Sequence, residues 1–273
     1  MKVISIKNVK KNLSKAYTSV SSEELNEILM NVFDCDFTTL SSEILIPVSK
    51  YIIAVKSIKK YLKGQPVNKI FKKAYFYGNQ FFIDKNVLAP RQDTELLIEI
   101  ILKETEVKKK LKILDLCTGS GIIAITLAQK LDCDIDATDI SAKALKIAKR
   151  NAKNIGAKIN FAKSNMFEKV DDKYDIIISN PPYISKKDWE QLDKSVKKYD
   201  PKISLIGGKD GLKFFRDIAN NAKNFLKRNG KIILEIGDDQ KDSVTKIFEQ
   251  FGFTNIECFK DYNNKDRALV IKI

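Results

Sequence analysis

The stretch LKILDLCTGSG at residues 111–121 decides the fold, because a short apolar strand in it runs directly into a loop with two glycines. Leu111 to Leu116 is the predicted strand, and apolar spacing over residues 122–127 predicts a helix after the loop. In an open α/β sheet, ligands bind at the carboxyl ends of the strands, near the first crossover. Residues 115–121 are therefore the predicted ligand loop.

The same alternation of strands and helices continues to the end of the chain. Further strands are predicted at residues 135–139, 158–162, 174–179, 231–236, 254–259 and 267–273. Helices are predicted at residues 94–101, 141–156, 211–228 and 239–251. Seven strands in repeated βα units predict an α/β fold, with a Rossmann-like, mostly parallel sheet and helices on both faces. The last two strands predict an antiparallel edge.

The first 60 or so residues are predicted to be helical instead. Ser21 to Leu25 is a helix start, and apolar residues at helical spacing follow it. A second helix is predicted from Ile44 to Tyr61, interrupted early by Pro47. Alternation over residues 74–83 predicts a β-hairpin that pivots on Gly78-Asn79. The predicted divisions are a small helical domain at 1–73, a hairpin linker at 74–88 and the α/β domain at 89–273.

The composition supports a folded chain and limits its chemistry. Of the 273 residues, 44% are hydrophobic and 31% are charged, which fits a buried core. No apolar run approaches the roughly 20 residues of a membrane helix, and the first residues lack a secretory signal pattern. We therefore expect a cytoplasmic location without membrane contact. Histidine is absent and the four cysteines lie far apart, so we expect no metal site and no imidazole base.

The net charge of +14 is concentrated towards the start of the chain. Residues 1–75 hold 13 Lys and 6 Asp or Glu, which is half of the excess. One interpretation is a surface for an acidic protein or for RNA. The other is that solvated lysines are spread there without a partner. Because arginine is absent from this segment, specific phosphate recognition is the weaker form of the first interpretation.

The ligand loop and the acid after the next strand predict a nucleoside site. Gly119 and Gly121 let the backbone approach a ligand where a Cβ would collide. Asp139 ends the next strand, and a carboxylate there can accept both ribose hydroxyls. Asp115 suits the cationic amino-acid portion of a sulfonium cofactor better than a pyrophosphate, which favours S-adenosylmethionine over NAD. A tight turn without a ligand is the alternative.

The strand at residues 174–179 ends in Asn180-Pro181-Pro182-Tyr183, which predicts an acceptor site. The two prolines make the corner stiff and free its carbonyls from strand pairing. The Asn180 side-chain oxygen and the Pro181 carbonyl can accept the two N–H bonds of an –NH2 group, and Tyr183 can stack on its plane. This arrangement would orient a poorly nucleophilic amide nitrogen towards an electrophilic methyl group. A rigid turn without a ligand is the alternative.

Asn-Pro-Pro-Tyr occurs in several amino-methyltransferase families, which act on DNA adenine, RNA bases or protein glutamine. From about residue 60 onwards, this chain resembles one of them, the peptide chain release factor glutamine methyltransferases of the class I S-adenosylmethionine-dependent superfamily. The segments that carry the resemblance are Lys63 to Val67, Val87 to Glu95, Asp115 to Gly121, Asn180 to Tyr183, Tyr199 to Pro201, Gly207 to Leu212, Leu234 to Gly237 and Asp266-Arg267. Cys117 stands where the family more often has glycine, and Met166 where an aromatic residue is common.

The resemblance implies methylation of the glutamine in the Gly-Gly-Gln loop of class 1 release factors, with S-adenosylhomocysteine as the second product. The small N-terminal domain would dock the release factor, and no nucleic-acid substrate is expected. The tetrapeptide from Asn180 to Tyr183 would hold the glutamine. The residues that would bind the cofactor are Asp115, Cys117, Thr118, Gly119, Ser120, Gly121, Asp139, Asn165, Met166 and Asn180.

Two other functions stay open from the sequence. An N6-adenine or other nucleic-acid amino-methyltransferase shares the tetrapeptide and suits the basic charge. It would need a recognisable base-reading or groove-reading element, and none is visible. A catalytically silent protein-binding module could keep the same fold. The intact Asn180 and Asp139 weigh against that second alternative.

Overall fold

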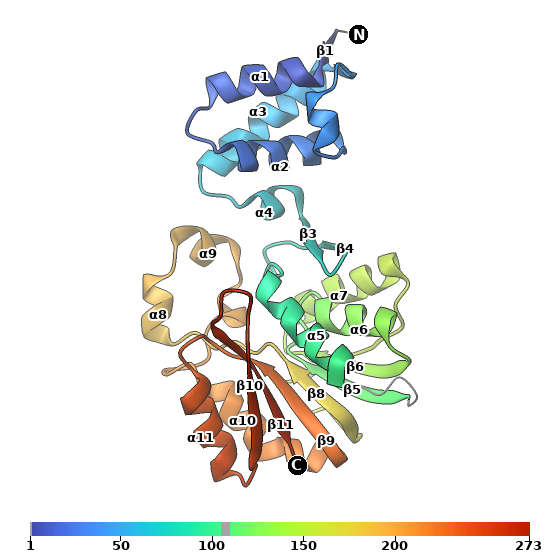
Figure 1. Ribbon diagram of the computed structural model, residues 1–273, viewed down its shortest axis with the longest axis vertical. Coiled ribbons are helices and arrows are strands. Elements are labelled where there is room, and N and C mark those ends of the chain that lie inside the picture. Colours follow the sequence, from blue (N-terminus) through green and yellow to red (C-terminus); the bar gives the residue numbers. More distant parts are fainter. Residues whose placement is uncertain (1, 105–109) are drawn as a thin grey trace. The chain divides into compact units, whose positions relative to one another are not determined.

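The computed structural model describes residues 2–104 and 110–273, and the chain divides into two compact units (Figure 1). The first unit comprises Met1–Lys72 and the second Lys73–Ile273. Among the described residues, no helix combines the length and the apolar character needed to cross a membrane.

The first unit is a small helical bundle with its own apolar core. Its elements are β1 (Val3–Ser5), α1 (Ile6–Ala16), α2 (Ser22–Phe33), the 3₁₀ helix η1 (Thr38–Ser41), β2 (Leu45–Pro47), α3 (Val48–Leu62) and α4 (Val67–Phe71). Buried side chains such as Val9, Ile28 and Ile58 bring α1, α2 and α3 together. Helix α2 begins where predicted, because the Ser21 hydroxyl accepts from the Glu24 amide and the Glu24 carboxylate accepts from the Ser21 amide.

Residues 45–47 form a strand, so the predicted helix at 44–61 is wrong at its start. Strand β2 pairs antiparallel with β1, with Ile46 opposite Ile4. Helix α3 begins at Val48, directly after Pro47. Proline fixes an extended backbone here and cannot donate an amide hydrogen, so it ends the strand and precedes the first helical turn. The remainder of the predicted helix is confirmed.

The second unit begins with a β-hairpin formed by β3 (Lys73–Phe76) and β4 (Asn79–Phe82). Its turn is Tyr77-Gly78, with φ values of 47° and 78°, one residue earlier than the predicted Gly78-Asn79 pivot. A two-residue turn with positive φ at both positions matches the twist of a hairpin. The predicted hairpin is therefore confirmed, and its predicted pivot is wrong by one residue.

A single seven-stranded sheet forms the centre of the second unit (Figure 1). Its elements in chain order are η2 (Gln92–Thr94), α5 (Glu95–Glu104), β5 (Leu111–Leu116), α6 (Ile122–Lys130), β6 (Cys133–Asp139), α7 (Ala142–Ile155), β7 (Asn160–Lys163), β8 (Tyr174–Ser179), α8 (Lys186–Gln191), α9 (Lys194–Tyr199), η3 (Lys202–Ser204), α10 (Lys213–Phe225), β9 (Leu226–Glu235), α11 (Lys241–Gln250), β10 (Asn255–Lys260) and β11 (Asp266–Lys272). The strand order is β10-β11-β9-β8-β5-β6-β7. The strands from β9 to β7 in this order are parallel, while β10 and β11 form the predicted antiparallel edge.

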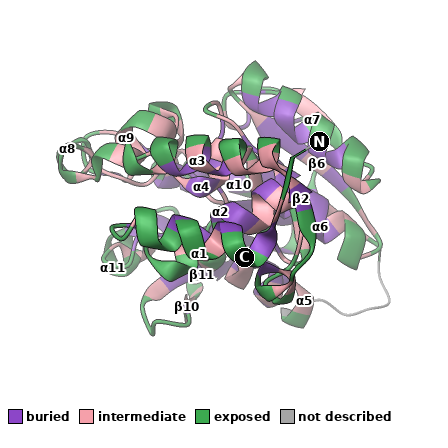
Figure 2. Ribbon diagram, turned by 90° about the horizontal axis from the view of Figure 1, so that it is seen from above, coloured by how far each residue is buried: buried purple, intermediate pink, exposed green. Residues whose placement is uncertain are grey.

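Alternate residues of the strands enter two apolar cores on opposite faces of the sheet. On one face, residues such as Leu114 and Ile232 pack against α10 and α11. On the other face, their neighbours Ile113 and Ile233 pack against α5, α6 and α7. Figure 2 shows the resulting pattern on α7, where buried and exposed residues occupy different sides of the helix. Because helices cover both faces, the strands are continuous apolar runs, and the predicted α/β fold is confirmed.

The boundary between the predicted helix at 211–228 and the predicted strand at 231–236 lies several residues earlier in the structure. Helix α10 ends at Phe225, and β9 begins at Leu226, whose pairing with Tyr174 is out of register with the rest of the strand. Asn229 has a φ of 64° within this irregular part. The Asn-Gly pair therefore marks an irregularity inside a strand, not the end of a helix.

Helices α8 and α9 have no counterpart in the prediction. Both are short, and neither contains a buried residue. A helix without a buried face has no apolar stripe, so the periodicity used to recognise helices is missing from its sequence. The bounds of the other predicted strands agree with the structure within two residues.

Candidate active site

Three parallel strands of the sheet end at the same level. Leu116 of β5 lies in register with Thr138 of β6 and with Ser179 of β8. The ligand loop begins one residue later at Cys117, and the proline corner begins one residue later at Asn180. The two segments singled out from the sequence are therefore neighbours at the carboxyl edge of the sheet, which is where α/β folds bind ligands.

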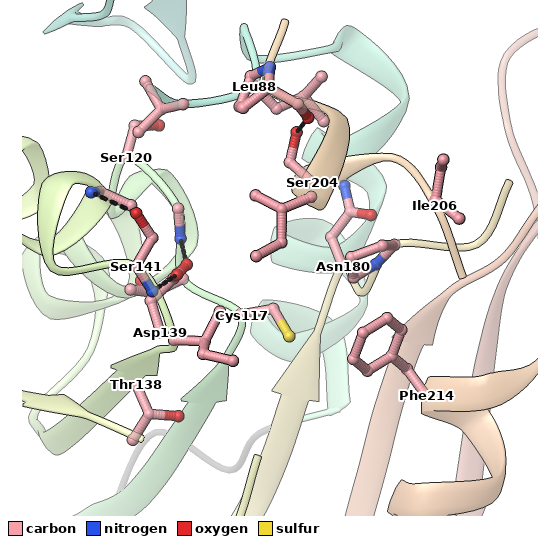
Figure 3. A pocket seen from close by; sticks show the side chains of 18 of the residues that line it. Leu88, Cys117, Ser120, Thr138, Asp139, Ser141, Asn180, Ser204, Ile206 and Phe214 are labelled. Carbon is pink, nitrogen blue, oxygen red and sulfur yellow. Dashed lines mark hydrogen bonds between the residues drawn. The ribbon is translucent and has the colours of Figure 1, made fainter. Parts of the chain in front are cut away.

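A cavity of about 520 Å³ lies at this edge (Figure 3). Its volume falls within the range of roughly 300–1,000 Å³ that small-molecule sites occupy. Figure 3 shows Asp139 and Cys117 on one side of the cavity and Asn180 and Phe214 on the other. The predicted site residues that line it are Cys117, Thr118, Gly119, Ser120, Asp139, Asn165, Met166, Asn180 and Pro182. The predicted site residues outside its lining are Asp115, Gly121, Pro181 and Tyr183.

Asp115 lies beneath the ligand loop and supports it. Its side chain has 0% exposure, and Thr118 Oγ1 donates to its Oδ2 at 2.6 Å. The Thr118 amide in turn donates to the Thr138 carbonyl at 2.9 Å. Cys117 has a φ of 61°, in the region that glycine adopts most readily. The loop therefore turns sharply over a buried carboxylate, and Asp115 does not itself line the cavity.

The two glycines of the loop have different roles. A Cβ on Gly121 would lie 2.9 Å from Ile125 Cδ1 and 3.1 Å from Ala148 Cβ, so this glycine lets α6 pack closely against α7. The nearest atom to a Cβ on Gly119 would be the Cys117 carbonyl, at 3.9 Å. Gly119 therefore leaves open space at the cavity wall, whereas Gly121 is required by the contact between two helices. That either glycine lets a ligand approach the backbone stays a prediction.

Asn151 of α7 holds the loop through the Ser120 carbonyl. Its Nδ2 donates to the Ser120 carbonyl at 2.9 Å and to the Phe82 carbonyl at 3.0 Å, while its Oδ1 accepts from the Phe82 amide at 2.8 Å. The side chain is buried with its polar atoms bonded. One asparagine thus joins the ligand loop to strand β4 of the hairpin.

The Asp139 carboxylate at the end of β6 is held in a fixed orientation by two backbone amides. Its Oδ2 accepts from the Gly119 amide at 2.9 Å and its Oδ1 accepts from the Ser141 amide at 2.8 Å. Each carboxylate oxygen retains acceptor capacity for a hydroxyl group. Burial raises the pKa of Asp139, and the two backbone hydrogen bonds oppose that rise. The geometry fits a diol bound at this position.

Apolar side chains form the wall next to Asp139. Ile140 and Met166 both line the cavity, and the Met166 Sδ lies 3.8 Å from the Cys117 Sγ. Met166 has a φ of 49°, and Ser164 Oγ stabilises its turn by donating to the Met166 carbonyl at 2.8 Å. A planar base would find apolar surface here.

The Asn-Pro-Pro-Tyr corner is braced by glycines of the loop before α10. A Cβ on Gly207 would lie 2.4 Å from the Pro182 carbonyl oxygen, and a Cβ on Gly211 would lie 2.4 Å from the Tyr183 carbonyl oxygen. Gln240 Nε2 donates to the same Tyr183 carbonyl at 2.9 Å. Both glycines are therefore required by close backbone approach, and they fix the position of the corner.

Thr94 and Glu235 join the corner from behind, and neither is among the predicted site residues. Asn180 Nδ2 donates to Thr94 Oγ1 at 3.2 Å, and Thr94 Oγ1 donates to Glu235 Oε2 at 2.6 Å. The Tyr183 hydroxyl donates to Glu235 Oε1 at 3.2 Å. Tyr183 is thus held at its hydroxyl end. Because residues 94, 180 and 235 come from three separate elements, the sequence offers no local signal for this arrangement.

Residues 199–201 are connected to the segment before η2. Asp200 Oδ1 accepts from the Ala89 amide at 3.4 Å, and Asp200 Oδ2 lies 3.6 Å from Arg91 Nη2. Ala89, Arg91 and Pro201 all line the cavity. This ion pair therefore joins two segments of the cavity wall that are more than a hundred residues apart in the sequence.

Two buried carboxyl groups near the site have pKa values close to neutral pH. Burial raises the pKa of Asp115 to about 7, against the hydrogen bond from Thr118. Burial also raises the pKa of Glu235 to about 7, against Thr94, Tyr183 and the nearby charge of Arg267. Perturbed carboxyl groups of this kind are typical of functional sites.

Comparison with known proteins identifies the family. The family model for the methyltransferase small domain matches residues 90–197 of this chain. The release factor glutamine methyltransferase of Clostridium acetobutylicum is 36% identical over 96% of this chain and 97% of its own. The chain belongs to the release factor glutamine methyltransferase family. The enzyme of the same name from Lactococcus lactis subsp. lactis is 42% identical, over 78% of this chain and 80% of its own.

Solved structures agree with this family at the level of the fold. A methyltransferase from Pyrococcus furiosus matches with a TM-score of 0.57 at 18% identity, covering 80% of this chain and 98% of its own. The resemblance predicted from the sequence is thereby confirmed, and so is the class of the enzyme, a methyltransferase with a class I fold.

Proposed function

We propose that this enzyme transfers a methyl group from S-adenosylmethionine to the side-chain amide nitrogen of the glutamine in the Gly-Gly-Gln motif of class 1 release factors. The observation that carries the proposal is one cavity lined by both Asp139 and Asn180. One of these residues suits a nucleoside, and the other suits a primary amide. Two relatives, which cover 96% and 78% of this chain, are named release factor glutamine methyltransferase. A substrate that acts on the ribosome implies that the reaction takes place in the cytoplasm.

The cavity fits S-adenosylmethionine on its own geometry. Asp139 can accept the ribose hydroxyls while the Gly119 and Ser141 amides hold it in place. Ile140 and Met166 provide apolar surface for the adenine. The residues proposed to hold the cofactor directly are Cys117, Thr118, Gly119, Ser120, Asp139, Asn165, Met166 and Asn180. When bound, S-adenosylmethionine supplies an electrophilic methyl group on a sulfonium sulfur.

Asp115 and Gly121 are proposed to act on the cofactor from a distance. Asp115 is buried under the loop and bonded to Thr118, so its ionised form would stabilise a cation on the far side of the loop through space. Gly121 keeps α6 against α7, which places the N-terminus of α6 and the loop before it. Both residues therefore shape the cofactor site without lining it.

Asn180 and Pro181 are proposed to hold the glutamine amide. The Asn180 Oδ1 and the Pro181 carbonyl oxygen each accept one N–H bond. Pro182 lines the cavity beside them, and Tyr183 supports the corner through its hydrogen bond to Glu235. An amide nitrogen is a poor nucleophile because its lone pair is delocalised into the carbonyl group. Fixing both hydrogens orients this nitrogen, and orientation of this kind is worth roughly 7–11 kcal/mol in favourable cases. The two oxygens also stabilise the positive charge that develops on nitrogen.

The nitrogen loses its extra proton after methyl transfer, when it has become strongly acidic. No strong base is then required, which agrees with a chain that contains no histidine. The first unit, Met1–Lys72, is proposed to dock the release factor. Its excess of lysine over acidic residues suits an acidic partner surface.

A labelling experiment tests the proposed function. The full-length enzyme is incubated with methyl-labelled S-adenosylmethionine and either purified release factor or nucleic acid, and the label is mapped by mass spectrometry. We expect one methyl group on the Gly-Gly-Gln glutamine and none on a release factor in which that glutamine is alanine. Label on DNA or RNA without label on the glutamine would instead indicate a base methyltransferase. Absence of label from both substrates would indicate a protein-binding module.

A further inference from the structure

The orientation of the Asn180 amide decides whether the proposed site can work. A side-chain amide has an oxygen that accepts hydrogen bonds at one end and a nitrogen that donates them at the other. If the nitrogen faced the cavity, two –NH2 groups would oppose each other and the substrate amide would be repelled. The oxygen must therefore face the substrate. Because the oxygen and nitrogen ends of the Asn180 amide are nearly equal in size, shape alone cannot select one orientation, and a neighbouring group must do so.

The hydrogen bonds behind Asn180 have only one consistent direction. Glu235 is 2% exposed, and when ionised it can only accept. Thr94 is 1% exposed and has a single hydroxyl hydrogen, which it gives to Glu235 Oε2 at 2.6 Å. Thr94 Oγ1 is then left as an acceptor towards Asn180, 3.2 Å away. Asn180 must turn its nitrogen towards Thr94, which leaves Oδ1 as the end available to a substrate.

We propose that Thr94 and Glu235 are positioning residues that turn the carbonyl end of the Asn180 side chain towards the substrate. The inference rests on the proposed function for its catalytic consequence. Its structural content, the direction of the Asn180 amide, is independent of the substrate. Thr94 is itself one of the residues that line the cavity, whereas Glu235 does not line it and acts through Thr94.

Burial disfavours the ionised, accepting state of Glu235 that this direction requires, and several neighbouring groups oppose that effect. Tyr183, beyond β8, donates its hydroxyl hydrogen to Oε1. The charge of Arg267 on β11 favours the ionised carboxylate, whereas Asp93 of η2 disfavours it. Arg267 is itself fixed by Asp261, whose Oδ2 lies 3.1 Å from the Arg267 Nε. Glu235 is thus a buried carboxylate whose two oxygens both accept, on the side of the corner away from the substrate.

Protonation of Glu235 would remove the constraint. A protonated carboxyl group can donate to Thr94, and the threonine hydrogen is then free to turn towards Asn180. The Asn180 oxygen would be attracted to that hydrogen and away from the substrate. Burial raises the pKa of Glu235 to about 7. The turnover number at saturating S-adenosylmethionine should therefore fall as the pH drops through about 7.

The first experiment examines the Asn180 amide without any substrate. In NMR spectra of the full chain, the Asn180 –NH2 signals are assigned by their loss in Asn180→Ala. We expect slow exchange with water for one hydrogen of this group, and faster exchange in Thr94→Val, because valine keeps the shape but cannot accept. An exchange rate that Thr94→Val leaves unchanged overturns the inference, whatever reaction the enzyme catalyses.

The second experiment compares threonine variants by kinetics. Thr94→Val should lower kcat by about tenfold to a hundredfold, the usual consequence of a mispaired polar group. Thr94→Ser keeps the hydroxyl and should stay within about threefold of the wild type. The affinity for S-adenosylmethionine should be unchanged in both. Thr126→Val is the matched control, because Thr126 is fully buried in α6 and its Oγ1 has no partner among the described residues.

The third experiment separates positioning from packing. Glu235→Gln has the same shape but can present either end of its amide to Thr94, so kcat should fall by about tenfold or more. The decline of kcat below pH about 7 should also disappear in this variant. The inference is refuted if kcat of Glu235→Gln declines below pH about 7 as it does in the wild type. It is also refuted if Thr94→Val has a normal kcat. If the wild-type enzyme does not methylate glutamine, the proposed function fails instead, and the NMR result still decides the amide direction.

Discussion

Replacement of Gly207 by alanine should move the acceptor corner without touching the cofactor loop. The alanine Cβ would lie 2.4 Å from the Pro182 carbonyl oxygen and 2.6 Å from the Gly211 carbonyl oxygen. The φ angle of Gly207 is outside the left-handed region, so alanine brings no backbone strain of its own. Any effect of this change must come from the collision with the backbone of the corner.

The size of the displacement follows from the distances. Separations under 3.0 Å are essentially never seen for a Cβ, so the Pro182 carbonyl must retreat by at least about 0.6 Å. A misplacement of about 1 Å can cost a factor of about 100 in rate. We therefore expect kcat/KM to fall by about tenfold or more, with a loss of roughly 1–3 kcal/mol in the free energy of unfolding from overpacking.

The assay combines initial rates of release factor methylation with calorimetric titration of S-adenosylmethionine. Cofactor affinity should remain within about threefold, because the atoms nearest to the added Cβ belong to Pro182 and Gly211 and not to the loop at residues 117–121. Gly156→Ala is the matched control, since Gly156 has a φ of 81° and no atom within 4 Å of an added Cβ. It should cost roughly 1 kcal/mol of stability and leave kcat/KM unchanged. Full activity in Gly207→Ala, or an equal loss of cofactor binding, would refute the reasoning.

Three further predictions concern single side chains. Asn180→Ala should abolish methyl transfer while calorimetry still finds nearly normal cofactor binding, because the seven other residues proposed to hold the cofactor remain; an equal loss of both would show that its role is misassigned. Asp139→Asn should weaken cofactor binding by about tenfold or more, because an –NH2 group would face the Gly119 or Ser141 amide; unchanged binding would exclude a role in holding the ribose. Asp115→Asn should alter the pH dependence of stability. Because the pKa of Asp115 is raised to about 7 in the folded state, protonation of Asp115 contributes its full stabilisation below pH about 4, and this contribution is lost progressively as the pH rises through about 7. In urea unfolding, the variant should therefore gain roughly 1 kcal/mol per pH unit over the wild type between pH 5 and 7, and parallel curves would contradict this.

The sheet could be predicted because its strands repeat one local rule. Segments such as residues 111–116 and 174–179 are short apolar runs that helices cover on both faces, and each is followed by a recognisable turn or loop. The site residues at strand ends could be predicted for the same reason. Topology places the residues after Leu116 and after Ser179 side by side, so Cys117 and Asn180 had to be neighbours.

The errors arise where a local signal has two meanings. Residues 45–47 look like helix in their composition, but pairing with β1 makes them a strand, and a partner forty residues away cannot be seen in a short window. Asn229-Gly230 ends a helix in many proteins, and here it lies inside a strand. Helices α8 and α9 bury no residue, so no apolar stripe marks them.

The residues behind the acceptor corner were beyond prediction for a further reason. Thr94 and Glu235 are separated by 141 positions, and nothing in either neighbourhood points to the other. Their meeting depends on the way η2, β8 and β9 pack together. The sequence marked the groups that face the cavity, whose types are dictated by chemistry. Thr94 and Glu235 lie within two of the segments that carry the family resemblance, but neither could be assigned a role from the sequence, because that role depends on the fold.

The triple hydrogen bonding of Asn151 sets a limit on how this enzyme can be recombined with its relatives. Asn151 forms hydrogen bonds with both the ligand loop and strand β4, so the hairpin is structurally part of the unit that contains the active site. A chimera joined after the hairpin would combine a foreign Phe82 backbone with a native Asn151. A junction before Lys73 keeps the three bonds within one parent, and exchanged docking units should be joined there.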